Sequence, residues 1–259
     1  MSDAINKIDF VGAGSGAVDL ITLRGKTKIE EADVIVYAGS LVNKELLSFA
    51  KEGCIIHNSA TMTLEEVMEV MINAYTNGLK VVRLHTGDPS IYGAIREQMD
   101  ILDDKNIPYE VCPGVSACFG AAASLNLEYT LPGVSQTLII TRCEGKTKVP
   151  EKEGIVNLSS HNASMAIYLS SGLLEKLESE LLEGGYNKDT PAAIVYKATW
   201  PEEQKICCTV GTLAKTGAMN GIKDTALILV GDVINKSDYE RSRLYAKDFS
   251  TGYRKAVEE

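Results

Sequence analysis

The chain has 259 residues and a formal net charge of −9, and this length suits two α/β domains better than one small core. Hydrophobic residues make up 45% and charged residues 24% of the sequence, the balance of an ordinary globular protein. The acidic balance argues against nonspecific binding of nucleic acid, which needs a basic face. It still permits a local basic pocket for a small anionic ligand.

No apolar run approaches the roughly 20 residues of a membrane span, and the N-terminus MSDAINKIDF lacks the pattern of a signal peptide. We therefore expect a cytoplasmic protein with no membrane partner and no nucleic-acid partner. The six cysteines form no CxxC pair and no Cys/His cluster with zinc spacing. Reduced, mostly buried thiols and no metal site are expected.

The first half of the chain alternates short apolar strands with amphipathic helices. Strands are predicted at residues 8–12, 34–38 and 80–85, each ending at turn residues. Between the last two, Thr63 and Glu66 form a capping box that opens a helix at 63–76. A second helix is predicted to start near Ser90. This alternation predicts a mainly parallel sheet with helices on both faces.

The second half is predicted to hold a different, mixed sheet. A short strand ends at Pro113-Gly114 and a helix opens at about Ser116, so we divide the chain into domains 1–114 and 115–259, the latter with a charged tail. The strand at 205–210 follows the strand at 192–198 across a short link, as in a hairpin. Further strands are predicted at 137–142, 165–170 and 226–231, with a helix at 173–183.

The loop GAGSGA matches the dinucleotide-binding pattern at Gly12, Gly14 and Ala17. That interpretation also needs an acid at the end of the next strand, which here ends Tyr37-Ala38-Gly39. A nicotinamide cofactor is therefore not expected. The glycines either serve a ligand or only turn the chain tightly.

Two further turns lie where a strand ends and a helix begins, the edge where parallel α/β sheets bind ligands. In HTGDPSIYG, Asp88 either caps the following helix or belongs to a turn that presents backbone groups to a ligand. In CPGVSACFGAAAS, Ser116 opens a helix of small residues that lets a flat ligand or another backbone approach.

Together these segments resemble the S-adenosylmethionine-dependent tetrapyrrole methyltransferases. GAGSGAVDLIT is similar to the family's first loop, Gly87-Asp88-Pro89 to its second turn, and residues 113–117 to its third. The segments HTGDPSIYGAIREQM, TRCEGKTKVPE and VYKATWPEE resemble one branch, the precorrin-4 and cobalt-precorrin-4 C11-methyltransferases. The chain departs from the family pattern at Ser15, where Pro is usual, and at Ala17, where Asp is usual.

The resemblance implies two α/β domains with the active site in the cleft between them, and relatives suggest a homodimer. It implies S-adenosylmethionine as methyl donor, with S-adenosylhomocysteine as product, and an anionic tetrapyrrole on the cobalamin pathway as acceptor. The residues that the resemblance places at the donor are Ser15, Thr86, Gly87, Asp88, Ile91, Ser116, Ala117, Leu169, Ala193 and Ala226. Those expected at the acceptor are Gly14, Arg24, Tyr92, Arg96, Arg142 and Lys197.

Methyl transfer by in-line displacement depends mainly on orientation, which can be worth roughly 7–11 kcal/mol, so no strong acid or base is required. The sequence names no base, and the candidates are His85, His161, Glu144 and Tyr92. Arginine and lysine suit the acceptor's carboxylates. As a group, the cations beside the named segments are candidates for the acceptor's rim: Arg24, Arg83, Arg96, Arg142, Lys146 and Lys197.

Three alternatives stay open at this point. The enzyme could methylate another carbon of the macrocycle, or another acceptor such as a modified protein histidine. The chain could also be a noncatalytic tetrapyrrole carrier or a chelatase, which would have no tight site for S-adenosylhomocysteine. The sequence does not say whether the macrocycle holds cobalt.

Overall fold

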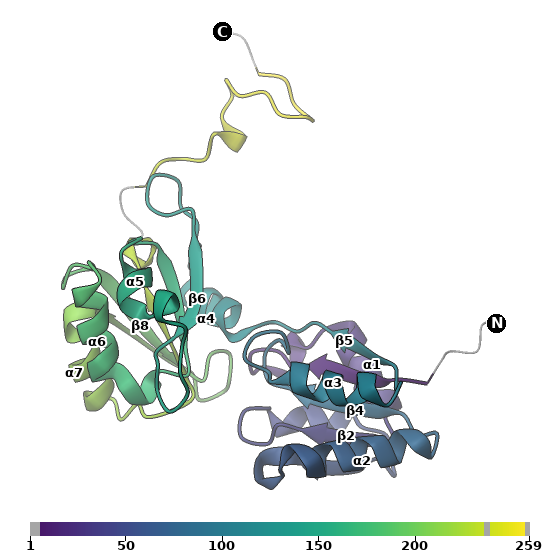
Figure 1. Cartoon of the computed structure of the whole chain (residues 1–259). Helices are drawn as coiled ribbons and strands as arrows, with labels where there is room; N and C mark the ends of the chain where they lie inside the picture. Colours follow the sequence, from purple (N-terminus) through teal and green to yellow (C-terminus); the bar gives the residue numbers. More distant parts are fainter. Residues whose placement is uncertain (1–5, 236–238, 257–259) are drawn as a thin grey trace. The chain divides into compact units, whose positions relative to one another are not determined.

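The structure, a computed structural model, describes residues 6–235 and 239–256 and divides the chain into two units (Figure 1). The first unit takes the chain up to Ser124 together with Lys197–Glu203, and the second takes Leu125–Tyr196 and the chain from Gln204 onward. Helix α4 (Ala117–Leu125) therefore falls almost wholly in the first unit, beyond the boundary expected at residue 114. Residues 197–203 belong to the first unit, although the chain before and after them belongs to the second.

The first unit contains an all-parallel sheet, which confirms the predicted fold class for this half. Its strand order is β3-β2-β4-β1-β5. The strands are β1 (Ile8–Gly12), β2 (Val34–Tyr37), β3 (Ile55–Asn58), β4 (Val81–His85) and β5 (Tyr109–Cys112). With α4, its helices are α1 (Leu23–Glu31), α2 (Leu64–Thr76) and α3 (Ile95–Asp104). Strand β3, with three of its four residues exposed, lies at the edge and was not predicted.

Both faces of this sheet are buried, as a parallel sheet requires. On one face, side chains such as Val11 and Val82 pack with Ile29 of α1. On the other, Phe10 and Val81 pack with Met71 of α2 and with α3. Two separate apolar clusters thus hold the strands so that the carboxyl ends of β4, β1 and β5 lie side by side.

Helix α2 begins as predicted. The Thr63 hydroxyl accepts from the backbone N–H of Glu66 at 3.3 Å, and the Glu66 carboxylate accepts from the N–H of Thr63 at 2.8 Å. The prediction that the next helix starts near Ser90 is wrong, because α3 begins at Ile95. Tyr92 (φ 55°) and Ala94 (φ 49°) are in the left-handed region, which a right-handed helix cannot include.

The second unit contains the predicted mixed sheet, in the order β6-β7-β10-β8-β9. Strands β6 and β7 are parallel, whereas β10 is antiparallel to both β7 and β8, and β8 and β9 form the predicted hairpin pairing. Its strands are β6 (Leu138–Arg142), β7 (Ser164–Tyr168), β8 (Pro191–Tyr196), β9 (Gln204–Thr209) and β10 (Ala226–Val230). Its helices are α5 (Ile155–Ser159), α6 (Leu174–Glu183) and α7 (Leu213–Met219).

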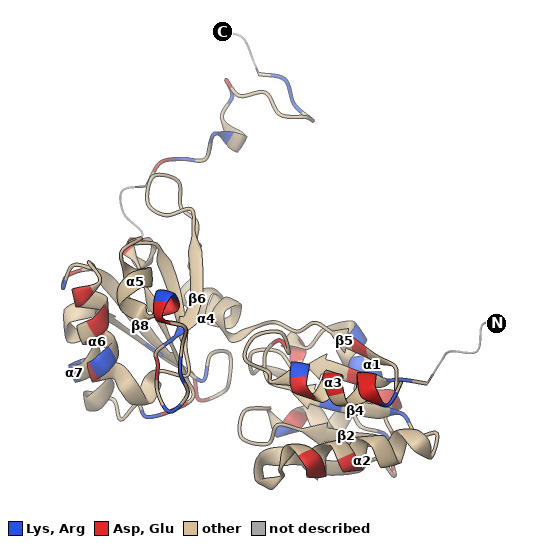
Figure 2. Ribbon diagram, in the orientation of Figure 1, with Lys and Arg blue, Asp and Glu red and all other residues tan. Residues whose placement is uncertain are grey.

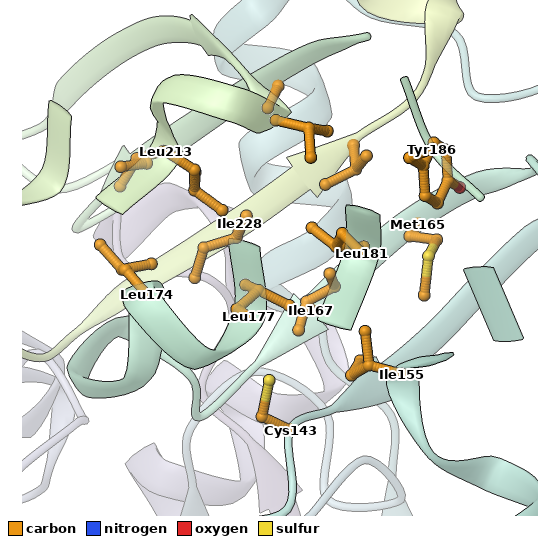
Figure 3. Close-up of a cluster of buried hydrophobic side chains, with 14 of the residues drawn as sticks. Cys143, Ile155, Met165, Ile167, Leu174, Leu177, Leu181, Tyr186, Leu213 and Ile228 are labelled. Atoms are coloured by element: carbon orange, nitrogen blue, oxygen red, sulfur yellow. The ribbon is translucent and has the colours of Figure 1, made fainter. Parts of the chain in front are cut away.

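One apolar cluster joins these helices to the second sheet. Figure 3 shows Leu177 and Leu181 of α6 with Ile167 of β7 and Ile228 of β10, together with Leu213 of α7. These five side chains are fully buried, so a layer of helices packs on the second sheet through one apolar core.

Short 3-10 helices connect the regular elements. They are η1 (Val18–Leu20), η2 (Lys44–Phe49), η3 (Ser59–Thr61), η4 (Glu151–Glu153), η5 (Ser171–Leu173), η6 (Val210–Thr212), η7 (Asp232–Ile234) and η8 (Arg243–Tyr245). Across residues 6–235 and 239–256, no helix has the length and apolar character needed to cross a membrane.

Candidate donor and acceptor site

Three turns meet at the carboxyl ends of β1, β4 and β5. Gly14 and Gly87 exchange two backbone hydrogen bonds, of 3.2 and 2.9 Å. A Cβ atom on Gly114 would lie 2.2 Å from the carbonyl oxygen of Gly87, and one on Gly12 would lie 2.6 Å from the same oxygen. Only glycine permits this approach of three backbones. The site predicted at the ends of these strands therefore has a wall made of main-chain atoms.

Asp88 ties two of these turns together. One carboxylate oxygen accepts from the backbone N–H of Ser90 at 2.9 Å and from the Ser90 hydroxyl, and the other accepts from the N–H of Gly114 at 2.9 Å. Burial alone would raise the pKa of Asp88, but the bonds from Ser90 and Gly114 outweigh it and lower the pKa. The interpretation of Asp88 as a helix cap is wrong, because α3 starts after Ala94 and has no side-chain cap.

The glycine loop at residues 12–17 is covered by the segment 197–203 of the same unit. Thr199 Oγ1 lies 3.0 Å from Ser15 Oγ and accepts from the N–H of Ala17 at 3.1 Å. The indole Nε1 of Trp200 donates to the carbonyl oxygen of Ser15 at 3.2 Å. Ser15 is consequently buried, and its side chain is directed into the protein rather than to solvent.

An open pocket of about 470 Å³ lies beside this loop within the first unit. Phe49 and Trp200 give it aromatic walls, while Asp19 and Glu45 contribute carboxylates. Its other lining residues are Ala17, Val18, Asn43, Thr199 and Pro201. The mostly apolar walls with few polar groups suit a flat organic ligand.

The donor residues expected in the first unit lie on the three turns. Ser116 lies close to Gly87, because a Cβ on Gly87 would be 3.5 Å from the Ser116 Cα. Ser116 is buried, and Ala117 after it is the first residue of α4. Thr86, with Ile91 further along the same loop, is half-buried. The structure thus brings the predicted first-unit donor residues to one edge of one sheet.

The donor residues expected in the second unit lie on three strands of the mixed sheet. Leu169 directly follows β7, has φ 52° and is 64% exposed. Ala226 opens β10 opposite Tyr196, whereas Ala193 is fully buried within β8. Leu169 is therefore accessible to a ligand, and Ala193 is placed as a core residue would be.

The Arg and Lys residues expected at the methyl acceptor differ in the contacts that they already make within the protein. Arg24 is exposed, 3.9 Å from the Glu110 carboxylate. Arg96 donates to Asp100 and Asp103 along α3, and Arg142 donates to the carbonyl oxygens of Cys143, Thr147 and Lys148. Lys197 Nζ lies 5.4 Å from the centre of the Trp200 ring and 3.8 Å from the Glu202 carboxylate. Lys197 is thus in contact with Trp200, a residue that lines the pocket.

The other two candidate cations are Arg83 and Lys146. Arg83 is buried on β4, donates to Gln98 and to the carbonyl oxygen of Val36, and has its pKa lowered by burial to about 10. Its expected place at a rim is wrong, since a buried side chain cannot form one. Lys146 is exposed in the loop after β6. Figure 2 shows Lys and Arg in several separate elements of each unit, so an anionic ligand would meet a few local cations rather than a basic face.

Of the four candidate bases, two belong to the first unit and two to the second. His85 is 3% exposed, its Nε2 has no hydrogen-bond partner, and burial together with the charge of Arg83 lowers its pKa to about 3. The Glu144 carboxylate accepts from the N–H of Val149, and His161 is exposed after α5. Tyr92 is 46% exposed in the loop before α3. Only Tyr92 and His85 lie near the three turns along the chain.

Sequence reasoning missed Thr199, Trp200, Asn43 and Gly120. The Asn43 side chain donates to the carbonyl oxygen of Gly16 at 3.0 Å, and a Cβ on Gly120 would lie 2.5 Å from the Ser15 Cβ. The unusual composition of VYKATWPEE was a signal for Thr199 and Trp200, but it carried no information about their partner. Among the residues that the structure describes, no group of three or more His, Cys, Asp and Glu side chains could hold a metal ion.

The comparisons with known proteins agree with this arrangement. The family of tetrapyrrole (corrin/porphyrin) methylases matches residues 7–214. A cobalt-precorrin-4 C(11)-methyltransferase of Methanocaldococcus jannaschii is 53% identical, over 98% of this chain and 98% of its own. A precorrin-4 C(11)-methyltransferase of Pseudomonas aeruginosa is 43% identical, over 95% of this chain and 97% of its own.

A solved structure shares the fold. The X-ray structure of a cobalt precorrin-4 methyltransferase, a cobalamin biosynthetic enzyme, superposes with a TM-score of 0.86 at 43% identity. The match covers 88% of this chain and 95% of that chain. Both the parallel first sheet and the mixed second sheet are therefore features of this fold.

Proposed function

This chain belongs to the tetrapyrrole (corrin/porphyrin) methylases, and on that premise we propose that it transfers a methyl group from S-adenosylmethionine to carbon 11 of cobalt-precorrin-4. Relatives matched over nearly their whole length are named for this reaction or for its cobalt-free counterpart. The observation in the structure that carries the proposal is the close approach of three backbones at Gly12, Gly87 and Gly114. These glycines bring three strand ends together at the edge where parallel α/β sheets bind ligands.

The donor supplies a sulfonium whose methyl carbon is already electrophilic. An electron pair of the macrocycle's π system at carbon 11 forms the bond to that methyl carbon, while the methyl–sulfur bond breaks and its electron pair stays on sulfur, which leaves S-adenosylhomocysteine. The macrocycle then releases a proton, which balances the charge. We propose that the protein's part is orientation and exclusion of water. The donor residues are Ser15, Thr86, Gly87, Asp88, Ile91, Ser116 and Ala117 in the first unit, and Leu169, Ala193 and Ala226 in the second.

For the acceptor we propose the pocket beside the glycine loop. Its aromatic walls, Phe49 and Trp200, suit the flat faces of pyrrole rings. Lys197 beside Trp200 can pair with a carboxylate substituent. The carboxylates of Asp19 and Glu45 would repel such substituents, so we expect the acceptor's carboxylates to lie near Lys197 and away from these two residues.

We propose that the other residues expected at the tetrapyrrole also contact it, and the structure supports them to different degrees. Gly14 lies in the first turn, where it pairs with Gly87. Arg24 and Tyr92 have exposed side chains. Arg96 and Arg142 would first have to exchange the hydrogen bonds that they make within the protein. Lys197 therefore has the strongest support among the cations.

The cobalt form is proposed because the relative at 53% identity is named for it. Relatives at 43% identity carry both names, so identity alone separates the two substrates only weakly. Incubation with cobalt-precorrin-4 and with precorrin-4 under equal conditions tests this choice. Faster turnover of the cobalt-free macrocycle would reverse it.

Product analysis tests the reaction itself. Incubation with donor labelled at its methyl carbon should give one new carbon resonance, correlated with carbon 11 of the macrocycle. A resonance at another ring carbon would identify a different methylase. Calorimetry should show binding of S-adenosylhomocysteine without added metal and no binding of NADH. A protein that bound the macrocycle but not S-adenosylhomocysteine would be a carrier or chelatase.

We also propose that the enzyme works as a cytoplasmic homodimer. The support is the resemblance to the family and the soluble character of the composition, with 24% charged residues. Sedimentation at micromolar concentration should give twice the chain mass of 28.0 kDa, and fractionation of the producing cells should place the protein with the soluble contents. A monomer at all concentrations would contradict the first part.

A further inference from the structure

The glycine loop cannot fix its own conformation. Gly12, Gly14 and Gly16 alternate with small residues, and the loop contains no proline. Gly14 (φ 82°) and Gly16 (φ 157°) occupy backbone conformations that glycine samples freely in the unfolded chain. Something outside the loop must select the one conformation in which Gly14 pairs with Gly87.

The segment 197–203 supplies those contacts from far along the chain. Thr199, which is 184 residues from Ser15 in sequence, bonds both to the Ser15 hydroxyl and to the N–H of Ala17. Trp200 donates its indole N–H to the Ser15 carbonyl oxygen. A third residue, Asn43, donates to the Gly16 carbonyl oxygen. Every residue from Ser15 to Ala17 therefore has a polar contact from outside the loop.

The segment itself is held in an uncommon conformation. Thr199 has φ 67°, a genuine outlier for a β-branched residue, and such outliers persist only where the surroundings over-determine them. The Glu203 carboxylate provides this restraint, since it accepts from the Thr199 N–H at 2.6 Å and from the Ser124 hydroxyl. The strained corner directs the Thr199 hydroxyl at the glycine loop.

We infer that Thr199 and Trp200 are positioning residues for methyl transfer, a role that rests on the proposed function. They fix the loop whose one end pairs with the Gly87 turn, and the same two residues line the pocket proposed for the acceptor. One corner of the chain thus sets the donor turn and the acceptor wall in a single arrangement.

Side-chain variants of Thr199 test this role. Thr199→Val removes the hydroxyl and keeps the branched shape, whereas Thr199→Ser keeps the hydroxyl. The loss of two hydrogen bonds should lower kcat/KM by about tenfold or more, with S-adenosylhomocysteine binding weakened in parallel. Thr199→Ser should restore both to within about threefold of the wild type. The matched control is Thr27→Val, since the exposed Thr27 hydroxyl bonds only within α1.

A second variant, Trp200→Phe, tests the same role in case Thr199→Val does not fold. Trp200→Phe keeps an aromatic wall and removes only the N–H donor to Ser15, so we expect a lower kcat with a nearly unchanged melting temperature. If Thr199→Val does not fold, Trp200→Phe decides. Wild-type kinetics in the folded variants, equal to those of Thr27→Val, would overturn the inference. A wild-type protein that neither binds S-adenosylhomocysteine nor methylates would instead overturn the proposed function.

Discussion

The carboxylate of Asp88 accepts a hydrogen bond of 2.9 Å from the backbone N–H of Gly114 and so joins the turn after β4 to the turn after β5. The other oxygen of the same carboxylate is bonded to Ser90. Asp88 is therefore an acceptor on both sides, and no neutral side chain of the same size can replace it there. This contact is a polar side-chain link between the turn after β4 and the turn after β5.

Asp88→Asn should consequently lower the free energy of unfolding by more than the loss of a helix cap would. An amide has one acceptor oxygen, so either Gly114 or Ser90 loses its partner, at a cost of about 1–3 kcal/mol of stability. Donor affinity should fall by about tenfold, and further in Asp88→Ala, because the two turns are no longer held together. Thermal melts and calorimetry with S-adenosylhomocysteine measure the two effects separately.

The control for these variants is Asp104→Asn, which removes an exposed negative charge from the same unit. It should leave both the melt and the affinity unchanged. If both Asp88 variants bound the donor like the wild type while melting lower, the link between the turns would be purely structural.

The buried His85 should make the free energy of unfolding depend on pH between about 6.5 and 3. Its pKa in the folded protein is about 3, below its usual value of about 6.5. Between these values the unfolded chain binds a proton that the folded protein does not, so stability falls as pH decreases from about 6.5 toward 3. The loss should reach about 2 kcal/mol between pH 7 and pH 5.

His85→Phe removes this ionisation. Any packing cost of the larger ring is independent of pH, so the difference in slope between the two proteins reports the histidine alone. Denaturant unfolding of both proteins at pH 5, 6 and 7 measures it. Parallel stability profiles, or a His85 ring resonance that titrates near pH 6.5, would show that the buried imidazole becomes protonated in the folded protein.

Lys197 and Arg96 should respond differently to loss of their charge. Lys197→Gln should raise KM for the tetrapyrrole several-fold with little change in kcat, because its ammonium lies beside the pocket wall Trp200. Arg96→Gln removes the same unit of charge, but its guanidinium is already bonded to Asp100 and Asp103. Its KM should change by less than about twofold. Steady-state kinetics at two salt concentrations test the pair, and equal effects would point to long-range attraction instead.

The regular elements of this fold could be predicted from local pattern. The capping box of Thr63 and Glu66 gave the start of α2, and the link between β8 and β9 gave a hairpin and hence a mixed second sheet. Both features depend on residues close together in the sequence. The start of α3 could not be predicted in this way, because neither Tyr92 nor Ala94 signals a left-handed backbone.

The candidate site could be predicted only in part for the same reason. Turn motifs located Gly14, Gly87 and Gly114, and the order of a parallel sheet placed them at one edge. The contact of Thr199 with Ser15 joins residues 184 positions apart, and no local pattern specifies such a pair. Arg83 was expected at a rim because the sequence does not reveal its buried partners, Gln98 and the carbonyl oxygen of Val36.

Gly114→Ala is expected to be the most disruptive small change in the site. The added Cβ would lie 2.2 Å from the Gly87 carbonyl oxygen and 2.8 Å from the Gly12 Cα. Both neighbours are backbone atoms at the ends of buried strands, so they cannot move aside without separating β4 and β1. We expect a loss of more than about 3 kcal/mol in the free energy of unfolding and no measurable binding of S-adenosylhomocysteine.

Gly53→Ala separates this steric effect from the cost of changing any glycine. Gly53 has φ 81°, and a Cβ there meets nothing within 4 Å, so only the backbone conformation is penalised, by about 1 kcal/mol. Denaturant unfolding and donor titration of both variants measure the contrast. If Gly114→Ala lost no more stability than Gly53→Ala and still bound the donor, the three backbones could not be packed as closely as the structure has them. The glycine wall proposed for the donor would then be wrong, even though the chain belongs to the same family.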